Sequence, residues 1–227
     1  MPRVTTKGTC PFCQGVFSKA GMTKHLAACR ARATAIEAES NLKSRGGRLF
    51  HLVVAGRHAP MYWMHLEVPA DAHLTDLDSF LRETWVECCG HLSAFQIAGV
   101  SYDSMDAHDW GSGDKRMDGV KIGKVLGVGR QGMYEYDFGT TTELSLSVVA
   151  ERTGPVGGKT ITVLARNEPP VIPCQNCGQP ATEICTECVW NGDGWICDAC
   201  VATHACGDDM LLPVVNSPRV GMCGYSG

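Results

Sequence analysis

Paired cysteines are the residues of this chain whose type and spacing could do chemistry. The sequence of 227 residues contains 13 cysteines. Eight of them form Cys-x-x-Cys pairs, at Cys10 and Cys13, Cys174 and Cys177, Cys185 and Cys188, and Cys197 and Cys200. The turn inside such a pair lets two thiolates reach one metal ion, and tetrahedral zinc is completed by two such halves. A redox pair, by contrast, is usually single and lies beside a βαβ unit, so this pattern indicates metal binding.

The first pair belongs to a four-ligand set near the start of the chain. Its spacing is Cys-x2-Cys-x11-His-x3-Cys, with ligands at Cys10, Cys13, His25 and Cys29. His25 and Cys29 are four residues apart, so on a helix both face the same side. The segment resembles the common DNA-binding zinc finger, with Phe17 and Met22 near its core positions, one residue closer together than usual. We expect a metal-held finger whose single helix, basic on its exposed side, continues past Cys29 to about Ser44.

The other three pairs lie near the end of the chain and are followed by His204 and Cys206. One interpretation is a cross-brace, in which the first and third pairs share one ion and the second pair shares another with His204 and Cys206. The predicted sets are Cys174, Cys177, Cys197 and Cys200, and Cys185, Cys188, His204 and Cys206. Two consecutive sites are the alternative, but the loops between them would be very short. The cross-braced arrangement resembles the B-box and MYND fingers.

Each predicted site has four protein ligands, which leaves no coordination position for water or substrate. The sequence therefore predicts three structural zinc ions and no catalytic metal. Cys88 and Cys89 lie at the end of an amphipathic helix, where small buried thiols are expected. Cys223 is left over, either as a free thiol or as a spare ligand.

The elements that must position these ligands divide the chain into three parts. Residues 1–47 form the finger and basic helix, residues 48–168 a central domain, and residues 174–227 the double-metal module with its tail. In the central domain, alternating apolar residues predict strands, and an apolar stripe predicts a helix closed by Gly90. The expected strands cover 49–55, 62–68, 92–102, 133–138, 141–151 and 160–166. This pattern is typical of an α+β fold with a largely antiparallel sheet.

Charge is distributed unevenly along the chain. Residues 1–48 carry nine Lys and Arg against two acidic residues, whereas the remainder carries eleven against twenty-two. A basic end on an acidic body favours contact with a polyanion, although a solvated basic helix would look the same. The candidate nucleic-acid contacts are Lys19, Lys24, Arg30, Arg32 and Lys43. There is no apolar run long enough for a membrane span and no secretory signal, so we expect a protein of the reducing cytoplasm.

Four motifs of the central domain resemble one protein family. They are MHLEVPA at Met64–Ala70, LTDL at Leu74–Leu77, HLSAF at His91–Phe95 and YEYDFG at Tyr134–Gly139. This order resembles the plasmid pRiA4b ORF-3-like family, which includes passenger proteins of insertion elements. The tail from Leu212 to Arg219, with Cys223-Gly-Tyr225, looks like the ending of its zinc-finger-bearing branch. The resemblance implies a mobile-element setting but supplies no reaction.

A departure from the family pattern bears on activity. Many relatives continue YDFG with Asp, Trp and His, whereas here TTTEL follows at Thr140–Leu144. A hydrolase or nuclease cleft built from His91, Asp103, His108, Glu135 and Asp137 is one hypothesis. The favoured hypothesis is a non-catalytic zinc protein that binds nucleic acid through its finger and a protein partner through the rest. A pure protein-interaction adaptor is the first alternative to it, ahead of the hydrolase or nuclease.

Overall fold

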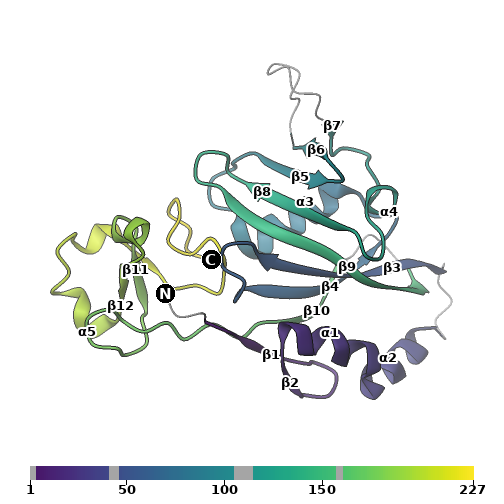
Figure 1. Cartoon of the computed structure of the whole chain (residues 1–227), viewed down its shortest axis with the longest axis horizontal. Coiled ribbons are helices and arrows are strands. Elements are labelled where there is room, and N and C mark those ends of the chain that lie inside the picture. Colours follow the sequence, from purple (N-terminus) through teal and green to yellow (C-terminus); the bar gives the residue numbers. More distant parts are fainter. Residues whose placement is uncertain (1–3, 41–45, 105–114, 157–160) are drawn as a thin grey trace.

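The computed structural model describes residues 4–40, 46–104, 115–156 and 161–227. Figure 1 shows a central domain around a large sheet, a small finger below it and a cysteine-rich module at one side. This arrangement confirms the expected α+β fold with a metal-binding-type module at each end. Lys43, one of the proposed nucleic-acid contacts, and His108 lie outside the described residues.

The central domain is built on an eight-stranded sheet with the strand order β10-β4-β3-β9-β8-β5-β6-β7. Every pairing is antiparallel except that of β6 with β7. The strands are β3 (Gly46–Gly56), β4 (Trp63–Pro69), β5 (Ser93–Ile97), β6 (Val100–Asp103), β7 (Lys115–Arg116), β8 (Gln131–Tyr136), β9 (Thr142–Pro155) and β10 (Thr162–Arg166). The largely antiparallel sheet expected from the sequence is therefore present.

One face of this sheet is covered by the helix α3 (Leu74–Leu81), which continues as the π-helical turn η1 (Arg82–Val86). Leu77, Leu81 and Trp85 from this segment are fully buried against apolar side chains of the sheet. The start of α3 is fixed by Asp76, whose carboxylate accepts a hydrogen bond from the N–H of His73 at 2.7 Å. A short helix, α4 (Ile122–Val125), closes the same core.

The segment 92–102, expected as one strand, is a hairpin of β5 and β6. Ala98 and Gly99 turn the chain with φ values of 52° and 77°. Left-handed residues at both positions of a two-residue turn match the right-handed twist of the flanking strands. Ala is a weak signal for that conformation, because the left-handed region favours Gly and Asn. The continuous apolar pattern on either side therefore predicted one strand where the chain makes two.

The N-terminal finger consists of β1 (Lys7–Thr9), β2 (Val16–Ser18), α1 (Lys19–Ala28) and α2 (Arg30–Ser40). The expected single helix is thus broken at Cys29, whose φ and ψ of −70° and 113° are extended. Met22 and Leu26 of α1 pack with Trp63 and Ala165, on the face of the sheet opposite α3. The finger therefore shares its apolar core with the central domain.

The C-terminal module has a three-stranded sheet in the order β12-β11-β13. Its elements are β11 (Glu183–Cys185), η3 (Cys188–Asn191), β12 (Trp195–Ile196), α5 (Asp198–Val201), η4 (Asp208–Met210) and β13 (Leu211–Pro213). After β13 the tail, residues 214–227, turns back to the central domain. Asn216 of the tail and Asn167, just after β10, exchange hydrogen bonds of 2.7 and 3.0 Å.

None of the helices in the described ranges combines the length and the apolar character needed to cross a membrane.

Candidate metal centres

The finger brings together the four residues predicted as its ligands. The ligating atoms of Cys10, Cys13, His25 and Cys29 all lie within 4.8 Å of one another. Cys10 and Cys13 come from the turn between β1 and β2, and His25 and Cys29 from α1 and its end. The ring of Phe17 stacks on that of His25 with centroids 4.0 Å apart, which fixes the orientation of the imidazole.

The C-terminal module brings its ligands together in the cross-braced way. One cluster contains Cys174, Cys177, Cys197 and Cys200, and the other contains Cys185, Cys188, His204 and Cys206. The consecutive pairing, with the first two Cys-x-x-Cys pairs around one ion, does not occur. The two clusters interleave along the chain, so each loop between ligands is fixed at both ends.

The distances within these clusters suit a bound metal. Zinc–sulfur bonds of about 2.3 Å and zinc–nitrogen bonds of about 2.0 Å, placed tetrahedrally, separate two sulfurs by about 3.8 Å and a sulfur from a nitrogen by about 3.6 Å. The Sγ atoms of Cys188 and Cys206 are 3.7 Å apart, and those of Cys177 and Cys197 are 3.4 Å apart. Cys13 Sγ lies 3.2 Å from Nε2 of His25. All thirteen cysteines, which lie within the described ranges, are free of disulfides.

The turns of two cysteine pairs favour the thiolate of the first cysteine. Burial raises the pKa of the Cys174 thiol, but backbone N–H groups of Cys177, Asn176 and Cys197 outweigh it and lower the pKa to about 6. Burial likewise opposes ionisation of Cys185, but the N–H of Cys188 and the ring of His204 help to lower its pKa to about 7. Since a metal binds the thiolate and not the thiol, Cys174 and Cys185, the first cysteines of their pairs, are prepared for coordination.

A fourth cluster of the same kind lies in the central domain and was missed in the sequence. It contains Cys88, Cys89, His91 and Cys223, with all ligating atoms within 4.8 Å of one another. Cys89, expected to be a small buried thiol, is exposed. The signal available in the sequence was a Cys-Cys-x-His run together with one unassigned cysteine. Because the two parts are 134 residues apart, spacing alone could not join them.

The tail that carries Cys223 is anchored by Arg219. This side chain is fully buried, and it forms an ion pair of 2.8 Å with the buried carboxylate of Asp137. Burial raises the pKa of Asp137, but the hydrogen bond from Arg219 and two backbone N–H groups hold it below its usual value. Arg219 also donates to the carbonyl of Thr140 and to Oγ1 of Thr142. The tail is therefore part of the packing of the central domain.

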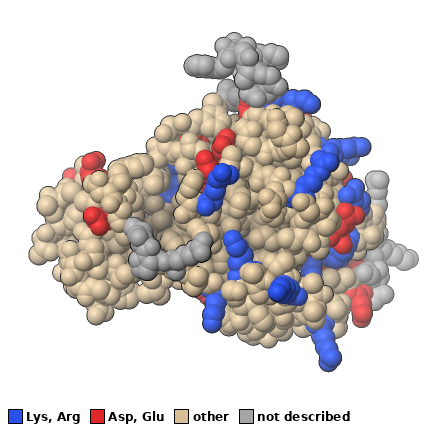
Figure 2. Space-filling view, in the orientation of Figure 1, with Lys and Arg blue, Asp and Glu red and all other residues tan. Residues whose placement is uncertain are grey.

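The proposed nucleic-acid contacts differ in their availability. Lys24 and Arg30 are exposed, whereas Lys19 is half-buried and so less available. Arg32 is turned toward the sheet and forms an ion pair with Glu67 at 3.2 Å, with both side chains largely buried. Figure 2 shows Lys and Arg side chains over the lower part of the molecule, where the finger lies below the sheet.

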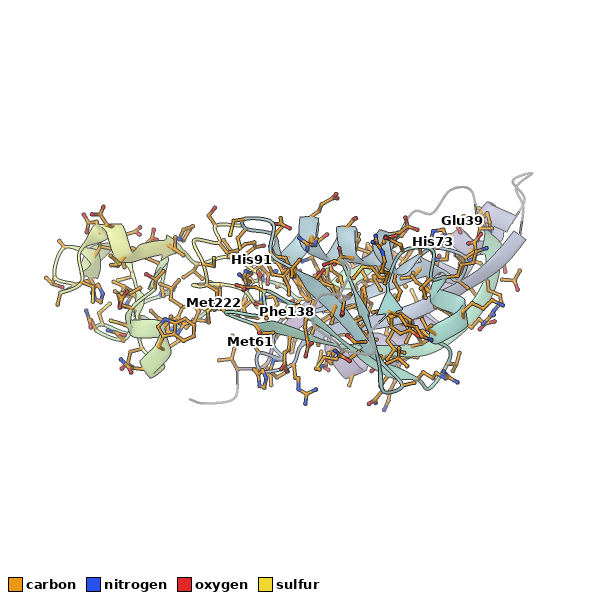
Figure 3. The ribbon with its side chains drawn as sticks, turned by 90° about the horizontal axis from the view of Figure 1, so that it is seen from above. Glu39, Met61, His73, His91, Phe138 and Met222 are labelled. Atoms are coloured by element: carbon orange, nitrogen blue, oxygen red, sulfur yellow. The ribbon has the colours of Figure 1, made fainter. Side chains whose placement is uncertain are left out.

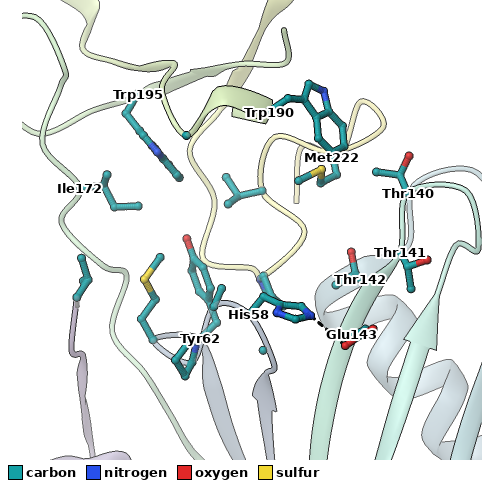
Figure 4. A pocket seen from close by; sticks show the side chains of 18 of the residues that line it. His58, Tyr62, Thr140, Thr141, Thr142, Glu143, Ile172, Trp190, Trp195 and Met222 are labelled. Carbon is teal, nitrogen blue, oxygen red and sulfur yellow. Dashed lines mark hydrogen bonds and ion pairs between the residues drawn. The ribbon is translucent and has the colours of Figure 1, made fainter. Parts of the chain in front are cut away.

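A cleft of about 750 Å³ lies between the central domain and the C-terminal module. Its wall on the module side includes Trp190 and Trp195, and its wall on the tail side includes Met222. Figure 4 shows Tyr62 on the domain side and Thr140–Thr142 opposite Ile172. The side chain of Trp190 is 64% exposed beside this cleft. Met61, Phe138 and Met222 lie at the same end of the central domain (Figure 3).

The cleft has two carboxylates in its lining, Glu143 and Asp193. Glu143 is paired with His58 at 3.0 Å and with Arg57 at 3.0 Å. Asp193 of the module lies on the other wall. Residues Thr140–Glu143, which directly follow the Tyr134–Gly139 motif, thus line part of this cleft.

The residues of the hydrolase hypothesis are mostly engaged elsewhere. Asp137 lies 3.6 Å from Nε2 of His91, but it is also the partner of Arg219. Asp103 accepts a hydrogen bond of 2.7 Å from Ser101. Asp103 and Glu135 lie on the strands flanking Ala94.

Comparison with known proteins gives a family and a distant structural likeness. No curated protein matches the chain. A crystal structure titled as a protein of unknown function, MM3350, from Methanosarcina mazei Go1 is similar at 16% identity and a TM-score of 0.46, over 58% of this chain and 75% of that one. The family model of the plasmid pRiA4b ORF-3-like protein matches residues 51–178, which is more than half of the chain. The match confirms the resemblance inferred from the motifs, and the chain belongs to the plasmid pRiA4b ORF-3-like family.

Proposed function

We propose that this chain is a non-catalytic, zinc-stabilised protein. Its cleft binds a segment of a partner protein in which a large apolar side chain is flanked by Lys or Arg. The observation that carries the proposal is the cleft itself, which has about 750 Å³ of space and an aromatic wall on which Trp190 is exposed. Ligand sites in proteins are typically clefts of this size with a mostly apolar lining and a few polar groups.

Zinc is the metal that these clusters fit best. Each predicted cluster contains three or four sulfurs and at most one imidazole, and soft thiolates in tetrahedral sets select zinc in a reducing compartment such as the cytoplasm. A set of four protein ligands is closed, so the three ions would have a structural role. Each could contribute on the order of 10 kcal/mol to the folding of its small module.

The chemistry of the cleft supports the proposed kind of occupant. Trp190 offers an exposed aromatic surface, and aromatic residues are enriched where protein interfaces are strongest. The module and tail, residues 174–227, carry six acidic residues and one basic residue, and that basic residue, Arg219, is buried. A peptide with a large apolar side chain flanked by Lys or Arg would therefore match both the lining and the charge.

Selection of peptides tests this proposal. The zinc-loaded full-length chain is screened against a displayed library of random peptides, and the enriched sequences should combine an aromatic or aliphatic residue with neighbouring Lys or Arg. Trp190→Ala should weaken binding of a selected peptide by about tenfold or more, the loss of about 1.4 kcal/mol or more that is typical of an interface anchor.

The control is Val128→Ala, which shortens an exposed apolar residue that does not line the cleft. It should leave affinity unchanged. If the library yields no enriched peptide, or if Trp190→Ala binds selected peptides as tightly as the original chain, this function is wrong.

Nucleic-acid binding by the finger is a second candidate, supported by the exposed Lys24 and Arg30. Phosphate contacts would dominate, because one finger reads only about three base pairs and usually works in tandem. With Arg32 paired to Glu67, the contacts would be fewer than the sequence suggested.

The salt dependence of DNA retention tests the second candidate. The logarithm of the binding constant should fall with the logarithm of salt by about 0.9 for each phosphate neutralised. The double variant Lys24→Ala and Arg30→Ala should reduce this slope. The charge-matched control changes Lys121 and Lys124, which are exposed on the central domain, and should keep it. If the full-length chain is not retained on DNA or RNA at low salt, the pure protein adaptor remains.

A further inference from the structure

We propose that Cys88, Cys89, His91 and Cys223 hold a fourth zinc ion, which fastens the tail to the central domain and so sets one wall of the cleft. The metal site stands independently of the peptide-binding function. Only its effect on the cleft rests on that proposed function.

The distances within this cluster match tetrahedral coordination as closely as the distances within the other three clusters do. Cys88 Sγ and Cys89 Sγ are 3.6 Å apart, and Cys89 Sγ and Cys223 Sγ are 3.7 Å apart. Nε2 of His91 lies 3.0 Å from Cys89 Sγ and 3.3 Å from Cys223 Sγ. The corresponding edges around zinc are about 3.8 Å between sulfurs and about 3.6 Å between sulfur and nitrogen.

A disulfide does not account for the positions of these atoms. The sulfurs of a disulfide are about 2.05 Å apart, whereas the closest pair in this cluster is separated by 3.6 Å. A disulfide would also leave the third cysteine and the histidine without a role. A metal ion, in contrast, uses all four side chains at once.

Unusual backbone turns bring the ligands together. Gly90 has a φ of 77°, which reverses the chain between Cys89 and His91. In the tail, Cys223 itself has a φ of 48°, between Gly221 at 78° and Gly224 at 69°. A non-glycine residue in the left-handed region is disfavoured and tends to occur at functional sites, where the surroundings hold it in place. A coordinate bond to Cys223 would provide such a restraint.

The surroundings of the site also suit a metal. Nη2 of Arg219 lies 3.3 Å from Cys88 Sγ, so it can donate a hydrogen bond to that ligand. Partners that hydrogen-bond to metal ligands orient them and tune the site. Since Arg219 belongs to the same tail as Cys223, the tail would supply both a ligand and its supporting hydrogen bond.

The count of cysteines is consistent with this assignment. The three predicted clusters use Cys10, Cys13 and Cys29, then four cysteines, then Cys185, Cys188 and Cys206. The fourth cluster uses the remaining three, so every one of the 13 cysteines belongs to a ligand set. No free thiol is left over, which is what a purely metal-binding use of cysteine predicts.

The site lies where it can control the cleft. Pro218, Val220 and Met222 of the tail line the cleft, and Met222 directly precedes Cys223. Figure 3 shows His91 and Met222 at the end of the central domain next to the C-terminal module. Loss of the ion would release the last residues of the tail and so loosen this wall.

Metal counting by native mass spectrometry tests the proposal on the full chain. The wild-type protein should contain four zinc ions. Cys223→Ser and His91→Gln should each contain three, and the matched control His58→Gln, which changes a histidine outside any cluster, should contain four. Hydrogen exchange in Cys223→Ser should become faster at residues 220–227 and remain unchanged at residues 174–206.

Two results would overturn the fourth site. One is a wild-type count of three that neither variant lowers. The other is a denatured, non-reduced mass that is lighter by two hydrogens, because that would reveal a disulfide. The peptide-binding function fails separately. A count of four zinc ions with no peptide bound would leave the fourth metal site intact and refute only peptide binding by the cleft.

Discussion

Arg219 joins the tail to the central domain through a fully buried guanidinium. Besides its ion pair with Asp137, it lies over the ring of Tyr136 at 4.8 Å from the centroid. A charge in this position is stable only while its partner is present, because an unpaired buried charge loses its hydration without compensation. Nothing in the sequence distinguishes Arg219 from a surface arginine, since a single charge in an irregular tail has no periodicity.

Replacing Arg219 by Met should lower the free energy of unfolding by about 3–5 kcal/mol, because it leaves the carboxylate of Asp137 buried without its partner. Urea denaturation of the zinc-loaded chain measures this. The control is Arg48→Met, which removes a more exposed ion pair with Glu151 and should lower stability far less. Equal losses in the two variants would contradict the role given to Arg219.

His51 on β3 and His65 on β4 form a second residue-scale feature. Both are buried, and Nε2 of His51 lies 2.8 Å from Nδ1 of His65. Burial, with further repulsion from Arg32, lowers the pKa of His51 to about 4. Burial, with further repulsion from His51, lowers the pKa of His65 to about 3. Both rings are therefore neutral at pH 7.

This pair predicts a stability that falls with acidification. The unfolded chain takes up protons on these histidines near pH 6.5, before the folded chain does, so stability declines as pH falls from about 6.5 toward about 4. His51→Gln should remove about 1 kcal/mol of the decline between pH 7 and pH 5.5. Denaturation with excess zinc at each pH measures it, and parallel profiles of the two proteins over this range would exclude the contribution.

At the scale of elements, most strands of the sheet could be predicted from the sequence, but the helix break and the tight turn could not. Strands β3, β4, β8, β9 and β10 were predicted to within a few residues, because half-buried strands alternate. The break at Cys29 and the turn at Ala98 were missed, since backbone conformation at single residues leaves little trace in a pattern. The three ligand sets encoded by local spacing are brought together, whereas the fourth depends on tertiary folding.

The tail behaves as an element of the central domain, which predicts how fragments fold. A fragment of residues 46–168 lacks Arg219 and the residues that hydrogen-bond to Trp85, namely Asn216 and Ser217. It should be less stable than a fragment in which residues 214–227 are fused to it by a flexible linker. Urea denaturation compares the two, and equal midpoints would show that the tail contributes nothing to this domain.

At the scale of the whole molecule, metal binding by the finger would be coupled to its packing against the central domain, because the two share an apolar core. The finger covers Trp63, which is 1% exposed, so unfolding of the finger would uncover an indole of the central sheet. Chelation should therefore shift tryptophan fluorescence to the red while circular dichroism of the central strands persists. Trp63→Phe should reduce the shift, and an unchanged shift in that variant would mean that the finger stays docked without metal.

The hydrogen bonds between Asn167 and Asn216 have a consequence for how this chain can be re-engineered. The chain leaves the central domain at Asn167 and re-enters it at Asn216, so the cysteine-rich module is a cassette spliced into a host domain. A host domain tolerates an inserted cassette when the two insertion points lie close together, because a short loop can then close the gap at small entropic cost. Excising residues 168–215 and bridging the ends with four Gly and Ser residues should leave a folded host that retains two zinc ions, at the finger and at Cys88, Cys89, His91 and Cys223. The same insertion points would accept a different cassette.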